Sequence, residues 1–210
     1  MAIWAIGDVH GCRDRLEELW KRLGPGRDDT VIFLGDLIDR GPDPAGVIRF
    51  VRERSADARV VALRGNHEDL CLTWHRTRDP ADRDLWMWNK GYTTLESYGF
   101  APGDPDAAVP AGDLRFLEAM PLWHREGEVV FVHAGLRPGV PLGRQDPHDL
   151  LWIRDEFYGA PEAFSHPVVF GHTPFRGVFR RGPLVGIDTG AVYGGKLTAY
   201  EPFEDRIVQV

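Results

Sequence analysis

Five short stretches of the sequence carry side chains that bind metal ions and phosphate groups, and each follows an apolar run of strand length. The stretches are GDVHG (7–11), GDLIDRG (35–41), GNHE (65–68), VHAG (132–135) and FGHT (170–173). In α/β proteins, ligand sites gather beyond the carboxyl ends of the strands. We therefore expect these five turns to meet and form one site.

The polar residues of these turns suit a pair of divalent metal ions, which needs oxygen donors, imidazole rings and one carboxylate that touches both ions. Asp8 and His10 are two residues apart, so an extended backbone projects both side chains towards the same ion. Asp36 follows the adjacent strand and is placed to bridge the pair. The remaining donors, each within two residues of a glycine, are Asn66, His133 and His172.

Any one of these motifs could be an ordinary polar turn or a buried structural histidine. The five together favour a metal site. The other histidines, which lack a strand-end setting and receive no role, are His75, His124, His148 and His166.

The spacing of apolar residues predicts the elements that position these turns. Apolar runs at 3–6, 31–34 and 60–63 alternate with helical patterns that include Leu16 and Val47. Such βαβ alternation predicts parallel strands with right-handed crossovers. The last third returns to strands, which predict a second, mixed or antiparallel sheet. These strands are expected at 128–132, 168–170, 185–187, 197–200 and 206–210.

Between these regions, residues from about 70 to 120 predict a helical insertion over the site. Its apolar side chains recur at the spacing of short helices and include Trp74, Leu85, Trp86, Trp88, Leu95 and Tyr98. Because aromatic side chains bury large areas, we expect them to form the insertion's own core. Stacking on a substrate is the alternative.

Length and composition indicate one soluble domain over residues 1–210. The formal charge is −7, from 25 Lys and Arg against 32 Asp and Glu, which argues against the basic face that nucleic-acid binding needs. No apolar run approaches the ~20 residues of a membrane span, and no signal peptide precedes the first strand. We expect a cytoplasmic protein in which Cys12 and Cys71 are reduced.

The motifs GDVHG, GDLIDRG, GNHE, HAG and GHT resemble the signature of the metallo-dependent phosphoprotein phosphatases (PPP-type), within the calcineurin-like metallophosphoesterases. The likeness is greatest to bacterial and phage members. It implies an α/β fold of two mixed β-sheets packed face to face with helices outside. It also implies that one ion is held by Asp8, His10 and Asp36, and the other by Asp36, Asn66, His133 and His172.

The chemistry of these donors does not select one metal. Carboxylate, carboxamide and imidazole groups together suit Mn²⁺, Fe and Zn²⁺ alike. We take Mn²⁺ as the first candidate for both ions.

The same residues suggest how a phosphoester is cleaved. Two cations lower the pKa of a bridging water by several units from ~15.7, so hydroxide is available near neutral pH for in-line attack on phosphorus. His67 can then protonate the leaving oxygen as a general acid, and the resemblance implies that Asp39 is its partner. The guanidinium fork of Arg40 suits a phosphoryl group.

Several residues in or near the motifs have candidate supporting roles. Arg154, in LLWIRDEF, resembles the second phosphate-binding arginine of bacterial members, and Asn66 is expected to contact phosphate as well as metal. Arg64 fits either a phosphate contact or a structural ion pair. Glu68 is expected to cap the helix that begins beside it or to orient the site, and Asp188 to support the ligands.

The resemblance implies a phosphomonoester hydrolase, and we expect a serine/threonine protein phosphatase that also accepts phosphotyrosine and small aryl phosphates. Phosphorylated proteins or peptides are the expected partners, without nucleic acid or membrane. The alternative is a symmetrical diadenosine tetraphosphate hydrolase or another nucleotide or RNA-end phosphoesterase. The diadenosine tetraphosphate hydrolases usually lack an aspartate at the position of Asp39 and have aspartate in place of Glu68. A non-enzymatic scaffold is disfavoured because His67, Asp39 and Arg40 are all present.

Overall fold

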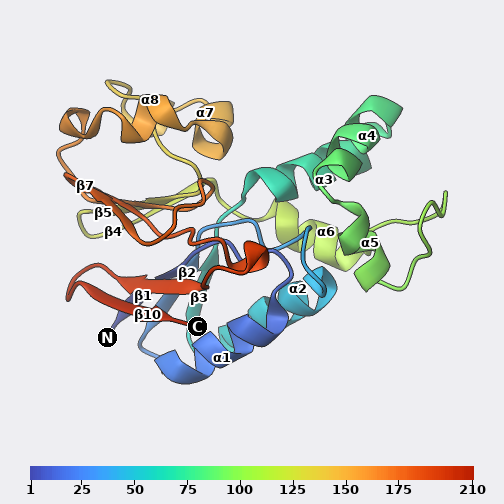
Figure 1. Cartoon of the computed structure of the whole chain (residues 1–210), viewed down its shortest axis with the longest axis horizontal. Coiled ribbons are helices and arrows are strands. Elements are labelled where there is room, and N and C mark those ends of the chain that lie inside the picture. The colour runs from blue at the N-terminus through green and yellow to red at the C-terminus, as the bar shows by residue number, and fades with distance from the viewer.

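Two five-stranded β-sheets face each other in the computed structural model, which describes residues 1–210 (Figure 1). The strands are β1 (Ile3–Ile6), β2 (Thr30–Phe33), β3 (Arg59–Ala62), β4 (Trp123–Glu126), β5 (Val129–Val132), β6 (Val168–Phe170), β7 (Phe179–Arg181), β8 (Leu184–Gly186), β9 (Thr198–Glu201) and β10 (Arg206–Gln209). The first sheet has the order β10-β9-β1-β2-β3 and the second β4-β5-β6-β8-β7. In each sheet three neighbouring strands are parallel and the other pairs are antiparallel. The expected fold class is confirmed.

Side chains that alternate along the strands build the layer between the two sheets. Ala5 on β1 and Phe131 on β5 belong to this layer. Their neighbours Trp4 and Val130 pack on the outer faces, among separate groups of apolar side chains. Because successive side chains of a strand point to opposite faces, the continuous apolar runs of the sequence reflect strands that are buried on both sides.

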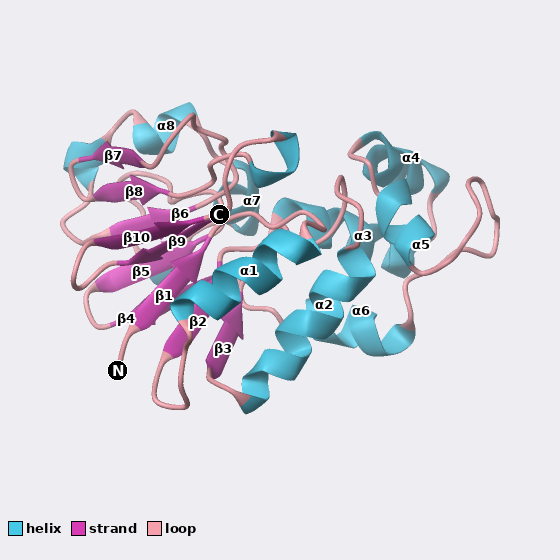
Figure 2. Ribbon diagram, turned by 60° about the horizontal axis from the view of Figure 1, so that its bottom comes forward, coloured by secondary structure: helices cyan, strands magenta, loops and turns pink.

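Helices cover the outer faces of both sheets (Figure 2). The helices α1 (Arg13–Leu23) and α2 (Pro44–Glu53) pack on the first sheet, and α7 (Pro147–Trp152) and α8 (Asp155–Tyr158) on the second. One turn of 3₁₀-helix occurs at each of η1 (Arg54–Ala56), η2 (Leu142–Arg144), η3 (Pro161–Ala163) and η4 (Ala191–Tyr193). No helix is both long enough and apolar enough to cross a membrane.

Local sequence signals mark the ends of α1 and α2. The Gly24 N–H donates to the Trp20 carbonyl from a left-handed backbone conformation with φ of 56°, which ends α1. Asp43 caps α2 by accepting a hydrogen bond from the Gly46 N–H, and Pro44 occupies the first turn, where its missing N–H costs nothing. The Asp43 cap fixes the point at which the chain leaves the turn after β2, and Gly24 fixes the point at which it leaves α1.

The last two strands differ from the prediction. Strands β9 and β10 do not extend the second sheet but pair beside β1 in the first sheet, so the chain crosses back after β8. The apolar pattern of a strand shows that it is buried and does not show which neighbour covers its edge. The strands β4 and β7 were also absent from the prediction. Both are edge strands with exposed polar side chains, so neither presents an apolar run.

Four helices from the middle of the chain lie together beside the sheets (Figures 1 and 2). They are α3 (Asn66–Thr77), α4 (Pro80–Trp88), α5 (Tyr92–Ser97) and α6 (Ala111–Glu118). Trp74 and Trp86 stack between α3 and α4, with ring centroids 5.2 Å apart, and both are buried. The prediction of an aromatic core is correct for these two residues. It is wrong for Leu85 and Trp88, which are 50% and 85% exposed because α4 packs on α3 through one face only.

Candidate metal centre and active site

Six parallel strands end at the candidate site, three from each sheet. The five motifs of the sequence follow β1, β2, β3, β5 and β6. The sixth strand, β8, leads to Asp188, which is also buried. Contacts across the sheets bring the turns together: the His172 N–H, beyond β6, donates to both carboxylate oxygens of Asp8, beyond β1, at 3.1 Å.

The backbone of these turns is unusual. Eight non-glycine residues have positive φ, and five of them lie in the motifs. These five are His10, Asp36, Asp39, Arg40 and His172. The left-handed region is uncommon for side chains with a Cβ and costs on the order of 1–3 kcal/mol per residue. The strained positions therefore coincide with the residues that the sequence singles out for chemistry.

Glu68 holds the turn after β2 in place. Its Oε2 accepts hydrogen bonds from the N–H groups of Gly65 (2.8 Å) and Asp36 (2.9 Å). Its Oε1 accepts from those of Leu37 (2.8 Å) and Ile38 (3.2 Å). The carboxylate is fully buried and also caps α3, so the expected capping role is confirmed. A single side chain thus fixes both the start of α3 and the backbone of Asp36.

Asp36 lies at the centre of the site. Its Oδ1 is 3.5 Å from Nε2 of His133. Its Oδ2 is 3.4 Å from Nε2 of His10 and 4.0 Å from Nε2 of His67. It is the one residue shared by the two groups of donor atoms that are close enough to hold metal ions. This position suits the bridging role that the sequence predicts for it.

One group of donors consists of Asp36, His10 and His67. His10 donates from Nδ1 to the Ile38 carbonyl (2.8 Å), which leaves the lone pair of Nε2 facing the centre. Arg40 donates to that nitrogen at 2.5 Å. The third predicted ligand, Asp8, lies nearby but accepts the His172 N–H, and His67 takes its place in the group.

The second group consists of Asp36, His133 and His172, and the fourth predicted ligand, Asn66, lies against it. Nε2 of His133 and Nδ1 of His172 each lie 2.9 Å from the amide oxygen of Asn66. His133 donates from Nδ1 to the Leu34 carbonyl (2.7 Å), so its Nε2 carries a lone pair that faces the lone pairs of that oxygen. Two acceptors at this distance repel each other unless both face a shared cation. The donor set therefore fits a metal ion.

The protonation of these groups also suits cation binding. Burial lowers the pKa of His10 to about 3, that of His172 to about 2 and that of His133 below its usual value, so the three rings are neutral ligands near pH 7. Burial alone would raise the pKa of Asp36, but the surrounding histidines outweigh it and hold that pKa below its usual range. Asp36 is therefore ionised.

Two further carboxyl groups show the opposite shift. Burial, with Asp188 and Asp36 close by, raises the pKa of Asp8 well above its usual value. Burial, followed by Asp36, raises the pKa of Asp188 to about 6 although the Gly190 N–H opposes this. Cations reverse such shifts because they stabilise the ionised form. The site thus gathers more carboxylates than it can ionise without positive charge.

His67 lies beside the metal-ligand groups and pairs with Asp39. Its Nδ1 is 2.7 Å from Oδ2 of Asp39, and both side chains are fully buried. Burial opposes a charged imidazole, yet Asp36 and the hydrogen bond to Asp39 outweigh it and raise the pKa of His67. Its Nε2 has no hydrogen-bond partner and faces Asp36. The ring can therefore carry a proton at a nitrogen directed towards the centre.

Two residues of the central helices hold Asp39, and the sequence did not identify either. The Trp86 indole N–H donates to Oδ2 of Asp39 (2.9 Å), and the Thr94 hydroxyl donates to Oδ1 (2.5 Å). The Thr94 oxygen also accepts the Asp39 N–H (3.0 Å). No local motif marks these two residues, because the contact depends on how α4 and α5 fold back. Asp188, in contrast, follows an apolar strand as the five motifs do.

The candidate phosphate-binding arginines differ in their surroundings. Arg40 is half-buried beside His10, and Arg154 is exposed and donates to the Thr173 hydroxyl (3.2 Å), one residue from His172. Arg64 instead donates to the Glu118 carbonyl (2.7 Å) at the end of α6. Of its two possible roles, the structural one agrees with this geometry.

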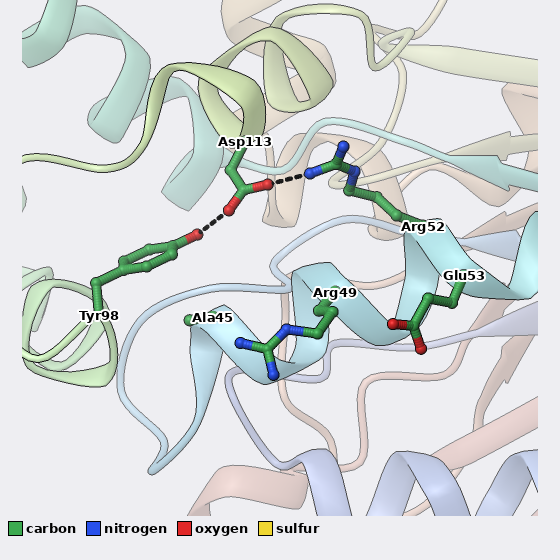
Figure 3. Close-up of a pocket in the computed structure, with 6 residues that line it drawn as sticks. All are labelled: Ala45, Arg49, Arg52, Glu53, Tyr98 and Asp113. Atoms are coloured by element: carbon green, nitrogen blue, oxygen red, sulfur yellow. Dashed lines mark hydrogen bonds and ion pairs between the residues drawn. The ribbon is translucent and has the colours of Figure 1, made fainter.

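A separate cavity lies between α2, α5 and α6, and contains no residue of the motifs (Figure 3). There Asp113 accepts hydrogen bonds from Arg52 and from the Tyr98 hydroxyl (2.7 Å for the latter). These bonds join α2, on the first sheet, to α5 and α6. The cavity thus belongs to the packing of the central helices.

The sequence as a whole matches known proteins of one family. The model of the calcineurin-like phosphoesterases matches residues 1–204. A serine/threonine-protein phosphatase 1 of Salmonella typhimurium (strain LT2) is 33% identical over 207 residues, which cover 93% of this chain and 89% of that protein. An asymmetrical bis(5'-nucleosyl)-tetraphosphatase, PrpE, of Bacillus cereus (strain Q1) is 30% identical over 232 residues, with coverage of 98% and 92%.

Solved structures show the same fold. The crystal structure of a candidate diadenosine tetraphosphatase superposes with a TM-score of 0.77 at 25% identity, covering 99% of this chain and 92% of that one. A protein serine/threonine phosphatase from Saccharomyces cerevisiae matches with a TM-score of 0.63 at 16% identity, covering 100% and 79%. The second likeness concerns the fold alone.

Glu68→Gln is expected to lower the free energy of unfolding by about 1–3 kcal/mol, because the amide nitrogen would face two backbone N–H donors that lose their acceptor. Glu17→Gln serves as a control, since the Glu17 side chain is 45% exposed and pairs only with Arg13. That control should change stability by less than about 0.5 kcal/mol. Urea unfolding measures both, and equal stability of the two variants would contradict the role assigned to Glu68.

Proposed function

Because the chain belongs to the calcineurin-like metallophosphoesterase family and is a hydrolase of phosphoric esters, we propose that it removes phosphoryl groups from serine and threonine side chains of proteins. Phosphotyrosine is a further substrate in this proposal. The observation behind the serine and threonine assignment is the buried His67–Asp39 pair. It can supply the proton that an alkoxide leaving group requires. The 33% identity to a bacterial serine/threonine phosphatase supports the same assignment.

The family uses a centre of two divalent metal ions. In the proposal, one ion is held by Asp8, His10 and Asp36, and the other by Asp36, Asn66, His133 and His172, with Mn²⁺ as the first candidate. When bound, the cations supply a nucleophile near neutral pH and polarise the phosphoryl group. The opposed lone pairs of His133 and Asn66 support the second set.

His67 acts as the general acid. Asp39 accepts its Nδ1 proton and so fixes the ring, while Nε2 faces Asp36 without another partner. The hydrogen bond to Asp39 stabilises the protonated form of the ring. The proton at Nε2 can then pass to the leaving oxygen as the phosphorus–oxygen bond breaks. Trp86 and Thr94 hold Asp39 so that it continues to face His67.

Three side chains orient the phosphoryl group in this proposal. Arg40 and Arg154 can each donate paired hydrogen bonds to its oxygens, and Asn66 contributes its amide group. Arg154 is exposed at the start of α8 and is free to meet an incoming substrate. Arg40 is close enough to His10 to reach the metal centre directly.

A second candidate function is hydrolysis of dinucleoside tetraphosphates. Relatives of that kind match 98% of this chain at 30% identity, and a candidate diadenosine tetraphosphatase has a TM-score of 0.77. These relatives are named as asymmetrical tetraphosphatases, whereas the sequence resemblance suggested the symmetrical kind. Both candidates need the same metal centre and differ in what surrounds the phosphoryl group.

Thr94→Val is expected to reduce kcat/KM for a phosphoseryl peptide by about 10-fold or more, a part of the ~10²–10⁴ that a positioned general acid supplies. The rate with p-nitrophenyl phosphate should fall much less, because p-nitrophenolate leaves without a proton. Thr94→Ser keeps the hydroxyl and should restore the peptide activity. An equal loss with both substrates would mean that Thr94 serves only the folding of the site.

Hydrolysis of a phosphoseryl peptide and of diadenosine tetraphosphate by the Mn²⁺-loaded protein decides between the two candidate functions. We expect a higher kcat/KM for the peptide, and metal chelation should abolish both activities. His67→Asn, which removes the acid and keeps a polar side chain, is the control for contaminating phosphatases. A clear preference for the dinucleotide would replace the first candidate by the second.

A further inference from the structure

A groove beside the metal centre is lined by aromatic and basic side chains. It lies between the end of α4, the start of α5 and η4, and has a volume of about 370 Å³. We name it the aromatic groove. It is lined by Arg40, Trp88, Asn89, Lys90, Tyr92, Val192 and Tyr193.

The three rings in this groove are unusually exposed. Trp88 is 85% exposed, Tyr193 63% and Tyr92 40%. A single exposed apolar residue needs no explanation, but these three come from two distant segments, 88–92 and 192–193, and meet at one cavity. Trp88 takes no part in the core of the central helices. The tryptophan that packs there from α4 is Trp86, which is fully buried. The rings are thus available to a ligand.

The charge of the aromatic groove is positive. Arg40 and Lys90 line it and no carboxylate does, in a chain whose formal charge is −7. The Arg40 guanidinium lies 5.7 Å from the centroid of the Tyr193 ring, and the Lys90 ammonium lies 5.7 Å from that of Tyr92. A ligand that matches this surface carries both a flat ring and negative charge.

Arg40 connects the aromatic groove to the metal centre. The same guanidinium that faces Tyr193 donates to Nε2 of His10. A phosphoryl group held at the centre would therefore place the next part of its substrate in the groove.

We propose that the aromatic groove binds the base of a nucleoside phosphate whose scissile phosphoryl group lies at the metal centre, an inference that rests on the second candidate function. The base stacks on Trp88 or Tyr193, and Lys90 pairs with a neighbouring phosphate. In phosphotyrosine the ring is attached directly to the scissile phosphate, and the only negative charge is on that phosphate. Arg40 would pair with it, and Lys90 would have no partner. A polyphosphate chain gives Lys90 a partner as well, which favours the nucleotide.

The direct test compares AMP with ribose 5-phosphate as inhibitors of phosphoseryl-peptide hydrolysis by the Mn²⁺-loaded protein. The two molecules share the phosphate and the sugar, and only AMP has a base. Stacking on an aromatic side chain is worth about 1–3 kcal/mol per base, so AMP should bind about 5- to 150-fold more tightly. Trp88→Ala should remove most of this difference. Trp123→Ala, at a tryptophan outside the groove that is 36% exposed, is the matched control.

Equal inhibition by AMP and ribose 5-phosphate, or the same ratio in wild type and Trp88→Ala, would overturn the proposal. So would an effect of Trp88→Ala confined to phosphotyrosyl peptides, which would assign the aromatic groove to an aryl leaving group. The failure of the second candidate function shows separately, as the absence of diadenosine tetraphosphate hydrolysis. AMP binding through Trp88 without that hydrolysis would support a base-binding groove and reject only the dinucleotide substrate.

Discussion

The buried carboxylate of Asp36 is the constraint on which the rest of the site depends. An isolated charge with so little exposure would be very costly, so the groups around it decide whether it stays ionised. Neighbouring histidines hold its pKa low, and Glu68 fixes the backbone that carries it. Because Glu68 is itself an acceptor of four backbone N–H groups, the first turn of α3 and the turn after β2 form one rigid unit.

The arrangement of the two sheets follows from the same requirement. Three parallel strands from each sheet end at Asp36 and its neighbours, so ligands far apart in the sequence meet within hydrogen-bond distance. The central helices supply the hydrogen bonds that hold Asp39. Trp86 and Thr94 hold Asp39 against His67, whose Nε2 lies 4.0 Å from Oδ2 of Asp36. Packing of the central helices thus orients the proton donor at the edge of the metal centre.

Much of this site could be predicted because strand-end turns leave a local pattern of an apolar run, a glycine and a polar donor. That pattern located five of the six turns, and Asp188 follows the same rule after β8. Contacts between distant segments leave no such pattern. The pairing of β9 with β1 was therefore missed, as were Trp86 and Thr94. Residue type alone does not predict burial either. Trp88 is exposed, whereas Trp86, two positions away on the same helix, is fully buried.

The metal content of the wild type and of Asp36→Asn tests the central claim most directly. After chelation and reloading with Mn²⁺, elemental analysis should find two ions per chain in the wild type, one for each donor group that shares Asp36. The asparagine variant keeps the shape of the side chain and loses the charge, so it should bind fewer ions and lose most of its turnover. Two tightly bound ions and near-normal turnover in that variant would contradict the bridging role of Asp36.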